Sequence, residues 1–331
     1  MEKKRIITGD RTTGQLHLGH LVGSLQNRVR LQREYETFIL LADVQALTTH
    51  YQNPGQMKES IYQVAIGNLA AGLDPEKVTL IQQSRVPSIA ELTVLYSMLV
   101  SVNVLRHNPT VKTEAKQCGY GDLTYGFLGY PVSQAADITF CSADLVPVGD
   151  DQLPHMEIAR KLARRFNELY ANGDELIRVP RALLSETPRL PGLDGSCKMG
   201  KSLGNAVYLS DDADAVNRKI HSAVTDTNRI AVRDKGNPDV CTVYAYHRAF
   251  NAGERADICE MCCGAQIGCV ACKTRLAEKL NTLLDPMRER RAYYERRRDE
   301  VRGFILEGSE KATRIGNEIM ARARAAMRLE I

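Results

Sequence analysis

The sequence contains no tryptophan and no apolar run long enough to span a bilayer. The second absence argues against a membrane protein. A secretion signal is missing as well, because the basic start of "MEKKRIITGD" is followed by too short an apolar run and by no small-residue cleavage site. We therefore expect a cytoplasmic protein.

A large excess of one charge is also absent. The formal net charge is +4, with 44% hydrophobic and 25% charged residues, a composition typical of globular proteins. This mild basic excess permits a polyanionic partner without requiring one. At 331 residues the chain is long enough for one large domain and a smaller one.

Cysteine is not scarce, but nine cysteines are an odd number, and disulfides are rare in a reducing compartment. A disulfide framework is therefore not expected. The spacing of the cysteines is better interpreted as the pattern of a metal-binding site.

The first half of the chain alternates strand-like runs with helical periodicity. This pattern predicts a doubly wound α/β fold with a parallel sheet, and a ligand at the carboxyl ends of its strands. We expect strands at residues 5–9, 37–47, 77–83 and 145–149, and helices at residues 17–32, 57–73, 88–102 and 150–171.

Strand-like runs stop near residue 210, and the rest of the chain has helical periodicity. We therefore expect an α/β domain over residues 1–210 and a helical domain over residues 211–331.

Two histidines follow the first expected strand. His17 and His20, in "HLGH", lie where a helix begins, and backbone N–H groups and the helix dipole attract phosphates there. Gly19 has no side chain and allows a nucleotide base to approach closely. Alone, this motif is compatible with several nucleotidyltransferases.

Two lysines occur about 180 residues later, in the glycine-rich segment "GLDGSCKMGKSLGN". Lys198 and Lys201 are expected on a mobile loop, where adaptable point charges can neutralise charge developing on phosphate oxygens. Alone, such a pair is more typical of a solvated surface loop.

Together and in this order, the two motifs resemble the HIGH and KMSKS signatures of class I aminoacyl-tRNA synthetases. The segments "TGDRTTGQLHLGHLVGSL", "YPVSQAADI" and "VPVGDDQLPHMEIARKLARRFN" are similar to those of tryptophanyl-tRNA synthetases, particularly a divergent bacterial branch. This resemblance implies a Rossmann-like catalytic domain, a helical anticodon-binding domain and a homodimer. Its implied ligands are ATP with Mg²⁺, L-tryptophan and the tRNA for tryptophan.

The resemblance also implies the chemistry: the tryptophan carboxylate attacks the α-phosphorus of ATP, pyrophosphate leaves, and the aminoacyl group passes to tRNA. His17, His20, Lys198 and Lys201 match the catalytic residues. The positions that match the ATP site are Arg11, Thr12, Thr13, Gly19, His20, Gly149, Asp150, Asp151, Leu190, Lys198, Met199, Gly200, Lys201 and Ser202.

Asp137 matches the aspartate that accepts the indole N–H in this family. A carboxylate in an apolar pocket gives a charge-assisted hydrogen bond, and a substrate without the donor would leave it unpaired. The bland alternative is that Asp137 caps or pairs within the core. The other positions that match the tryptophan site are Gly9, Gln45, Tyr130, Gln134 and Gln152.

Several residues depart from the family pattern. Gly200 stands where the loop usually has serine, and Cys197 is like an inserted residue just before it. Gln134, Gln45 and Arg11 stand where the commoner bacterial enzyme has methionine, histidine and glutamine. These differences concern loop closure and pocket polarity rather than the class of chemistry.

Six of the nine cysteines cluster in the expected helical domain. Cys269 and Cys272 form C-x-x-C, with Cys262 and Cys241 upstream, and four thiolates suit either tetrahedral zinc or a 4Fe-4S cluster. Resemblance to a subset of tryptophanyl-tRNA synthetases favours the cluster on Cys241, Cys262, Cys269 and Cys272. Cys259 or Cys263 could replace Cys262.

Two features leave alternatives open. The tract "MRERRAYYERRRDEVRG" suits either tRNA contact or a solvated helix surface with Glu–Arg pairs. Gly200 also allows a regulatory or partner-binding paralogue with weak charging. A tyrosine-specific relative, which shares the class and the dimeric fold, is a further alternative. A tRNA-free adenylyltransferase would leave "KMGKS" and the cysteines without a role.

Overall fold

The computed structural model describes residues 3–149, 152–184, 190–196, 199–200 and 203–330. A five-stranded parallel sheet, in the order β3-β2-β1-β4-β5, forms its centre. The elements up to β5 are β1 (Arg5–Arg11), α1 (Leu18–His20), η1 (Leu21–Leu25), α2 (Gln26–Leu31), β2 (Glu36–Ala42), α3 (Asp43–His50), η2 (Pro54–Gln56), α4 (Met57–Ala70), β3 (Val78–Gln82), η3 (Gln83–Arg85), α5 (Pro87–Ser97), α6 (Val102–Arg106), α7 (Pro109–Gln117), α8 (Tyr125–Thr139), β4 (Leu145–Val148), α9 (Leu153–Tyr170) and β5 (Arg181–Leu184).

The central strand β2 explains how the sheet is buried. Its side chains alternate between two hydrophobic clusters, with Ile39 and Leu41 in one and Phe38, Leu40 and Ala42 in the other. Successive side chains of a strand point to opposite faces, so helices must cover both faces of this sheet. The predicted doubly wound α/β architecture is therefore confirmed.

Two local expectations were wrong. Residues 37–47 were expected to form one strand, but β2 ends at Ala42 and α3 begins at Asp43. Asp43 accepts hydrogen bonds from the backbone N–H and the hydroxyl of Ser84, which fixes the start of the helix beside η3. Edge strand β5 was not expected at all, because "RALL" is short and mostly not buried.

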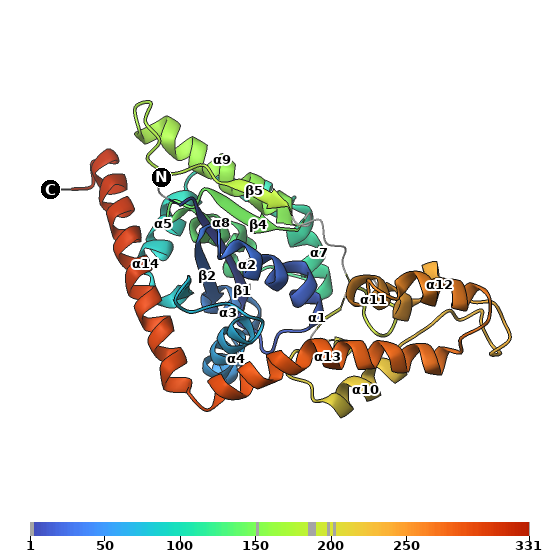
Figure 1. The fold of residues 1–331 in the computed structure, drawn as a ribbon. Helices are drawn as coiled ribbons and strands as arrows, with labels where there is room; N and C mark the ends of the chain where they lie inside the picture. The colour runs from blue at the N-terminus through green and yellow to red at the C-terminus, as the bar shows by residue number, and fades with distance from the viewer. Residues whose placement is uncertain (1–2, 150–151, 185–189, 197–198, 201–202, 331) are drawn as a thin grey trace.

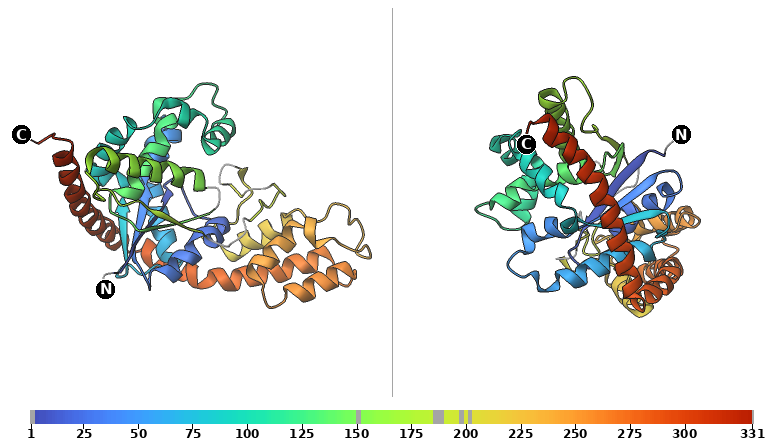
Figure 2. Two further views of the ribbon diagram at one scale, coloured as in Figure 1. Left: turned by 90° about the horizontal axis from the view of Figure 1, so that it is seen from above. Right: turned by 90° about the vertical axis from the view of Figure 1, so that its left-hand side faces the viewer.

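After β5 the remaining elements are α10 (Ala213–Ser222), η6 (Pro238–Val240), α11 (Thr242–Phe250), α12 (Arg255–Cys263), α13 (Cys269–Glu295) and α14 (Arg298–Ala326). Figures 1 and 2 show α10 to α13 extending away from the sheet as one arm. The long helix α13 packs on α10 and α11 in the arm and on α4 of the α/β unit. It therefore joins the two parts.

The last helix, α14, turns back along the α/β unit and packs on β3 and α5 (Figure 1). Ser309 Oγ accepts a hydrogen bond from Gln82 N at 3.0 Å, and Arg324 forms an ion pair with Glu91. A division of the chain at residue 210 stays a prediction, and within the second segment α14 covers the sheet of the first.

The arginine-rich tract at the junction of α13 and α14 forms internal ion pairs. Arg298 donates two hydrogen bonds to Glu59 of α4, at 2.6 and 2.9 Å, and Arg291 pairs with Glu295 at 2.8 Å. These two arginines do form Glu–Arg pairs, but Arg298 pairs with a neighbouring helix and the Arg291 side chain is largely buried, so a solvated helix surface does not describe them. Among the helices in the described ranges, none is both long and apolar enough to cross a membrane.

Candidate active site

The two histidines of the HLGH motif cap the first helix after β1. His17 Nδ1 accepts a hydrogen bond from Gly19 N at 3.1 Å, and His20 Nδ1 accepts one from His17 N at 3.2 Å. This is a reciprocal capping arrangement, with histidines in place of the usual Ser and Glu. The rings lie 3.9 Å apart, and a Cβ on Gly19 would meet the His17 ring at 2.9 Å. Glycine is required here by the packing of His17.

The segment after the lysine motif is held against the HLGH turn. Leu18 N donates to the Val207 carbonyl, and Leu209 N donates to the Leu16 carbonyl, each at 2.9 Å. His17 and Tyr208 form an antiparallel bridge between these segments. The two motifs, far apart in the sequence, are therefore neighbours in the fold.

The lysine motif itself is described only in part. Lys198, Lys201, Ser202 and Cys197 lie outside the described residues, as do Asp150 and Asp151. Met199 is 4% exposed, and its sulfur would lie 3.7 Å from a Cβ on Gly19. Gly200 N donates to Asn205 Oδ1 at 2.9 Å. Met199, between the two lysines, and the segment that follows them thus adjoin the histidine turn.

Leu190 is 6% exposed and belongs to the same hydrophobic cluster as Met199 and Leu193. Asn205, after the lysine motif, is joined to Asp194, before it, because Asn205 Nδ2 donates a hydrogen bond to Asp194 Oδ1 at 2.9 Å. Leu190 therefore packs in the same hydrophobic cluster as Met199, a described residue of the lysine motif.

Helix α8 brings three of the expected tryptophan-site residues to one side. Tyr130, Gln134 and Asp137 are spaced by four and three residues, so their side chains share a face about 10 Å long. Gln134 Nε2 approaches Gln152 Oε1 at 3.5 Å, and the Tyr130 hydroxyl lies 3.3 Å from His155 Nε2. Gln152 N donates to the Gly149 carbonyl at 3.0 Å.

Asp137 is 6% exposed and is held by Gln83, whose Nε2 donates to the carboxylate at 2.7 Å. Gln83 Oε1 in turn accepts from Gln45 N at 2.9 Å. Burial raises the pKa of Asp137 to about 7, opposed by the Gln83 hydrogen bond and assisted by the negative charge of Asp43. Gln45 Oε1 is buried and has no hydrogen-bond partner among the residues that the structure describes. A buried acceptor without a partner is costly unless a ligand supplies a donor.

The end of β1 contributes the remaining expected residues. Gly9 lies against β2, where a Cβ would overlap the carbonyl of Leu40. Arg11 pairs with Glu114 of α7 at 3.1 Å and lies over the Tyr130 ring at 5.1 Å. Thr12 is 1% exposed, with Oγ1 3.1 Å from Met57 Sδ, and Thr13 N donates to the Arg11 carbonyl at 2.9 Å.

The four cysteines chosen as ligands are neighbours within the arm, at the start of α11, the end of α12 and the start of α13. Burial and the neighbouring thiols Cys241, Cys262 and Cys269 raise the pKa of Cys272 to about 12. Arg229 Nη1 lies 3.8 Å from Cys262 Sγ and 4.0 Å from Cys269 Sγ. Within the described ranges, however, no three His, Cys, Asp or Glu side chains are arranged around a single metal ion.

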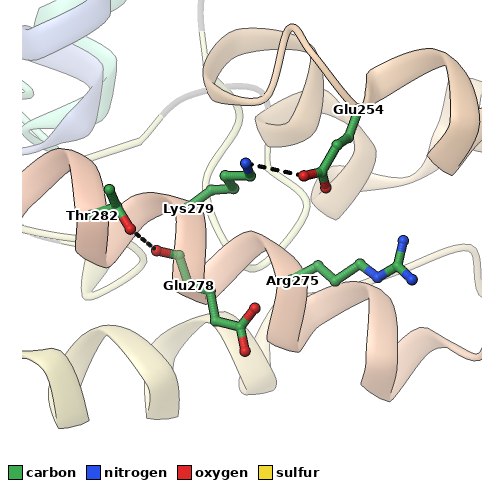
Figure 3. Close-up of a pocket in the computed structure, with 5 residues that line it drawn as sticks. All are labelled: Glu254, Arg275, Glu278, Lys279 and Thr282. Atoms are coloured by element: carbon green, nitrogen blue, oxygen red, sulfur yellow. Dashed lines mark hydrogen bonds and ion pairs between the residues drawn. The ribbon is translucent and has the colours of Figure 1, made fainter.

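A hollow of about 400 Å³ in the arm is lined by Glu254 and by four residues of α13 (Figure 3). In it Lys279 Nζ lies 3.0 Å from Glu254 Oε1, while the Arg275 side chain extends away from that pair. Glu254 also accepts from Asn251, which contacts His247, and His247 Nε2 lies 3.4 Å from Cys272 Sγ. A hydrogen-bonded chain therefore connects this surface ion pair to Cys272.

Two side chains at the site were missed in the sequence. Gln83 is a polar residue at the end of a strand, and only the fold shows that it reaches Asp137. Glu114 lies on α7, whose polar sequence gave no signal of contact with Arg11. A buried glutamine directly after a β-strand run was the one available hint for the first.

Comparison with known proteins gives consistent results. The family model for class I tRNA synthetases (W and Y) matches residues 1–285. Tryptophan–tRNA ligases of Streptococcus mutans and Streptococcus pneumoniae are 47% and 46% identical over 99% of this chain, covering 98% and 99% of their own lengths.

Among solved structures, tryptophanyl-tRNA synthetase from Campylobacter jejuni, complexed with ADP and tryptophan, superposes with a TM-score of 0.85 at 26% identity, covering 98% of this chain and 99% of that one. These matches agree with the parallel sheet and with the histidine turn that adjoins the lysine motif. The chain belongs to the class I tRNA synthetases of the tryptophan and tyrosine family.

Proposed function

We infer that this chain is a tryptophan–tRNA ligase that uses Mg-ATP. The observation that carries this choice is near-full-length identity of 46–47% to tryptophan–tRNA ligases. The tyrosyl-tRNA synthetase from Archaeoglobus fulgidus shares only 22% identity at a TM-score of 0.69, which indicates a common fold alone. Tryptophan is thus preferred over tyrosine as the substrate.

The reaction has two steps. The tryptophan carboxylate attacks the α-phosphorus of ATP and pyrophosphate leaves. The terminal ribose hydroxyl of the tRNA then attacks the aminoacyl carbonyl of the adenylate, and AMP leaves. His17, His20, Lys198 and Lys201 stabilise the charge that develops on the phosphates, so positioning and electrostatics supply most of the rate.

For the ATP site, support comes from how the histidine turn and the lysine motif are joined. The backbone pairs of Leu18 with Val207 and of Leu16 with Leu209 hold the two segments together. A nucleotide bound over Gly19 and the start of α1 therefore lies within reach of both motifs. The full proposed set adds Arg11, Thr12, Thr13, Gly149, Asp150, Asp151, Leu190, Met199, Gly200 and Ser202.

For the tryptophan site, support comes from the buried polar atoms of the α8 face. Asp137 accepts the indole N–H, and the unpartnered Oε1 of Gln45 is a second buried acceptor nearby. Tyr130, Gln134 and Gln152 line the other end. Gly9 provides the close approach to the backbone at the end of β1.

We propose that Cys241, Cys262, Cys269 and Cys272 hold a 4Fe-4S cluster. Four thiolates suit tetrahedral zinc as well as a four-iron cluster, so the choice of the cluster rests on the resemblance of the cysteine spacing. A four-iron cluster uses a separate thiolate for each iron, and the cation of Arg229 beside Cys262 and Cys269 suits an anionic group. The cluster would have a structural role in the arm.

We also propose a cytoplasmic homodimer whose arm binds the tRNA anticodon. Support for the dimer comes from large apolar side chains at the surface of α5, α6 and the turn between them: Val94, Met98, Val102 and Val104 are 58%, 67%, 53% and 49% exposed. Contiguous exposed apolar surface commonly marks a protein contact.

The test is ATP–pyrophosphate exchange on purified protein with tryptophan and with tyrosine, followed by aminoacylation of tRNA. Exchange with tryptophan alone is expected. Exchange with tyrosine alone would contradict the substrate. An absence of exchange with either amino acid would favour a regulatory paralogue.

A further inference from the structure

The Arg11–Glu114 ion pair lies beside the ring of Tyr130. Arg11 is the last residue of β1, at the carboxyl edge of the sheet where a ligand is expected. Glu114 comes from α7, which is not adjacent to β1 in the sequence, and the side chains are 32% and 26% exposed. The pair is therefore accessible from solvent and positioned by two separate elements.

Tyr130 links this pair to the proposed tryptophan site. Its ring lies 5.1 Å below the Arg11 guanidinium, and both Arg11 and Glu114 are within hydrogen-bonding reach of its hydroxyl. Burial, and then the negative charge of Glu114, raise the pKa of this hydroxyl, so it stays protonated and can donate. Asp137 lies seven residues further along the same face of α8.

This arrangement matches the two ends of a zwitterionic amino acid. With the indole at Asp137, the ammonium and carboxylate groups extend along α8 toward Tyr130. The ammonium needs an anionic acceptor, since a buried cation without one is costly. Glu114 offers a carboxylate there, and Arg11 offers the opposite charge for the substrate carboxylate.

We propose that Glu114 is a specificity-determining residue that receives the α-ammonium group of tryptophan, while its ion-pair partner Arg11 orients the carboxylate. The inference rests on the proposed tryptophan site. When substrate enters, the internal ion pair is exchanged for two ion pairs to the zwitterion. After activation the carboxylate charge is lost, but the ammonium remains bound to Glu114.

A purely structural role for the same pair makes a different prediction. If Arg11–Glu114 only holds α7 against β1, its loss affects every ligand of the pocket equally. If Glu114 binds the ammonium, only ligands that carry an ammonium are affected. Ligands that differ in this one group therefore separate the two roles.

The experiment compares L-tryptophan, tryptamine and indole-3-propionate as ligands of the whole protein. Tryptamine lacks the carboxylate and indole-3-propionate lacks the ammonium. Because the chain contains no tryptophan, the change in indole fluorescence of each ligand reports its binding without a contribution from protein indole groups. For Glu114→Gln we expect Kd to rise about 10-fold or more for tryptophan and tryptamine. We expect no rise for indole-3-propionate, which is freed from a repelling carboxylate.

Two further variants complete the design. Glu114→Asp keeps the charge and should recover part of the preference for ammonium ligands. Glu91→Gln removes a surface ion pair with Arg324, away from the site, and should leave all three affinities unchanged.

Equal weakening of all three ligands, or unchanged affinities, in Glu114→Gln would overturn the inference. If the unmodified protein neither binds tryptophan nor supports exchange with it, the proposed function fails instead. Thermal unfolding of each variant checks that the fold is retained.

Discussion

The guanidinium of Arg28 lies 2.6 Å from a carboxylate oxygen of Asp10, and these side chains are only 2% and 8% exposed. Arg28 also donates to Asn68 Oδ1 at 2.9 Å and to the Gly9 carbonyl at 3.1 Å. Burial alone would raise the pKa of Asp10, but the charge and hydrogen bonds of Arg28, with a smaller effect from His20, lower it to about 2. This network ties β1, α2 and α4 together behind the histidine turn.

Replacing one partner of this pair should destabilise the fold strongly. Arg28→Met leaves the Asp10 carboxylate buried without a counter-charge, at an expected cost of about 3–5 kcal/mol in the free energy of unfolding. Urea denaturation measures this change in the free energy of unfolding. The double variant Arg28→Met, Asp10→Asn removes both charges and should recover part of the loss. A single variant within about 1 kcal/mol of the parent would contradict the expectation.

The ionisation of Asp137 should make stability fall with rising pH. Its pKa is raised from 3.8 to about 7 in the fold, so the folded chain binds a proton that the unfolded chain has released. The stabilisation from that proton is complete below pH 3.8 and lost as pH rises through about 7. Asp137→Asn should remove a pH-dependent contribution to the free energy of unfolding on the order of 4 kcal/mol, of which roughly 3 kcal/mol lies between pH 5 and pH 8. Urea denaturation at pH 5 and pH 8, without ligand, tests this.

The same residue predicts how tryptophan binding depends on pH. The ionised carboxylate accepts a charge-assisted hydrogen bond from the indole N–H, whereas the protonated group offers only a weaker, neutral carbonyl oxygen. Tryptophan should therefore bind more tightly as pH rises through about 7. Asp137→Asn should bind weakly with little pH dependence over this range. Fluorescence titration from pH 5.5 to pH 8.5 measures the affinity for tryptophan. If the affinities of the unmodified protein and of Asp137→Asn changed with pH in the same way, Asp137 would not be the acceptor of the indole N–H.

Two glycines of α14 should respond oppositely to alanine. A Cβ on Gly308 would overlap the carbonyl oxygen of Leu80 on β3, whereas nothing lies within 4 Å of a Cβ on Gly303. Gly308→Ala should therefore loosen the helix from the sheet and cost several kcal/mol, on the order of other overpacked sites. Gly303→Ala should stabilise the helix by up to about 1 kcal/mol. Similar melting temperatures for the two variants would refute the packing argument.

Iron content tests the proposed cluster directly. Anaerobically prepared protein should contain about four irons per chain and absorb near 400 nm. Cys272→Ser and Cys269→Ser should lose both signals, while Cys118→Ser, an exposed cysteine of the α/β unit, should retain them. Zinc in place of iron, or no bound metal in the unmodified chain, would sink the assignment.

Local pattern was sufficient for the buried parallel strands and for the motifs. β1, β2 and β3 are apolar runs bounded by polar residues, and this pattern marks a buried strand whatever its partner. It was insufficient for β5, whose four residues are mostly accessible to solvent. It also could not show that α14 returns to the sheet, because the periodicity of a helix does not say which surface it covers.

The residues of the candidate site also fall into those that a local sequence pattern identifies and those that only the fold identifies. His17 and His20 carry a recognisable spacing, and so could be chosen in advance. Gln83 and Glu114 could not be chosen in advance, because each contacts a residue far along the chain. Gln83 contacts Asp137, 54 residues away, and Glu114 contacts Arg11, 103 residues away. A polar residue in a polar segment has no pattern of its own, so its role depends on tertiary structure.

The return of α14 to β3 has a consequence for the architecture. Because the chain leaves the sheet after β5 and comes back to it through α13 and α14, the arm is an insertion with both ends anchored. Its excision would therefore leave two fixed ends for a short linker to bridge. Any tilt of the arm must also bend the chain at two places. Because α13 packs on both parts, it would transmit that motion to α4.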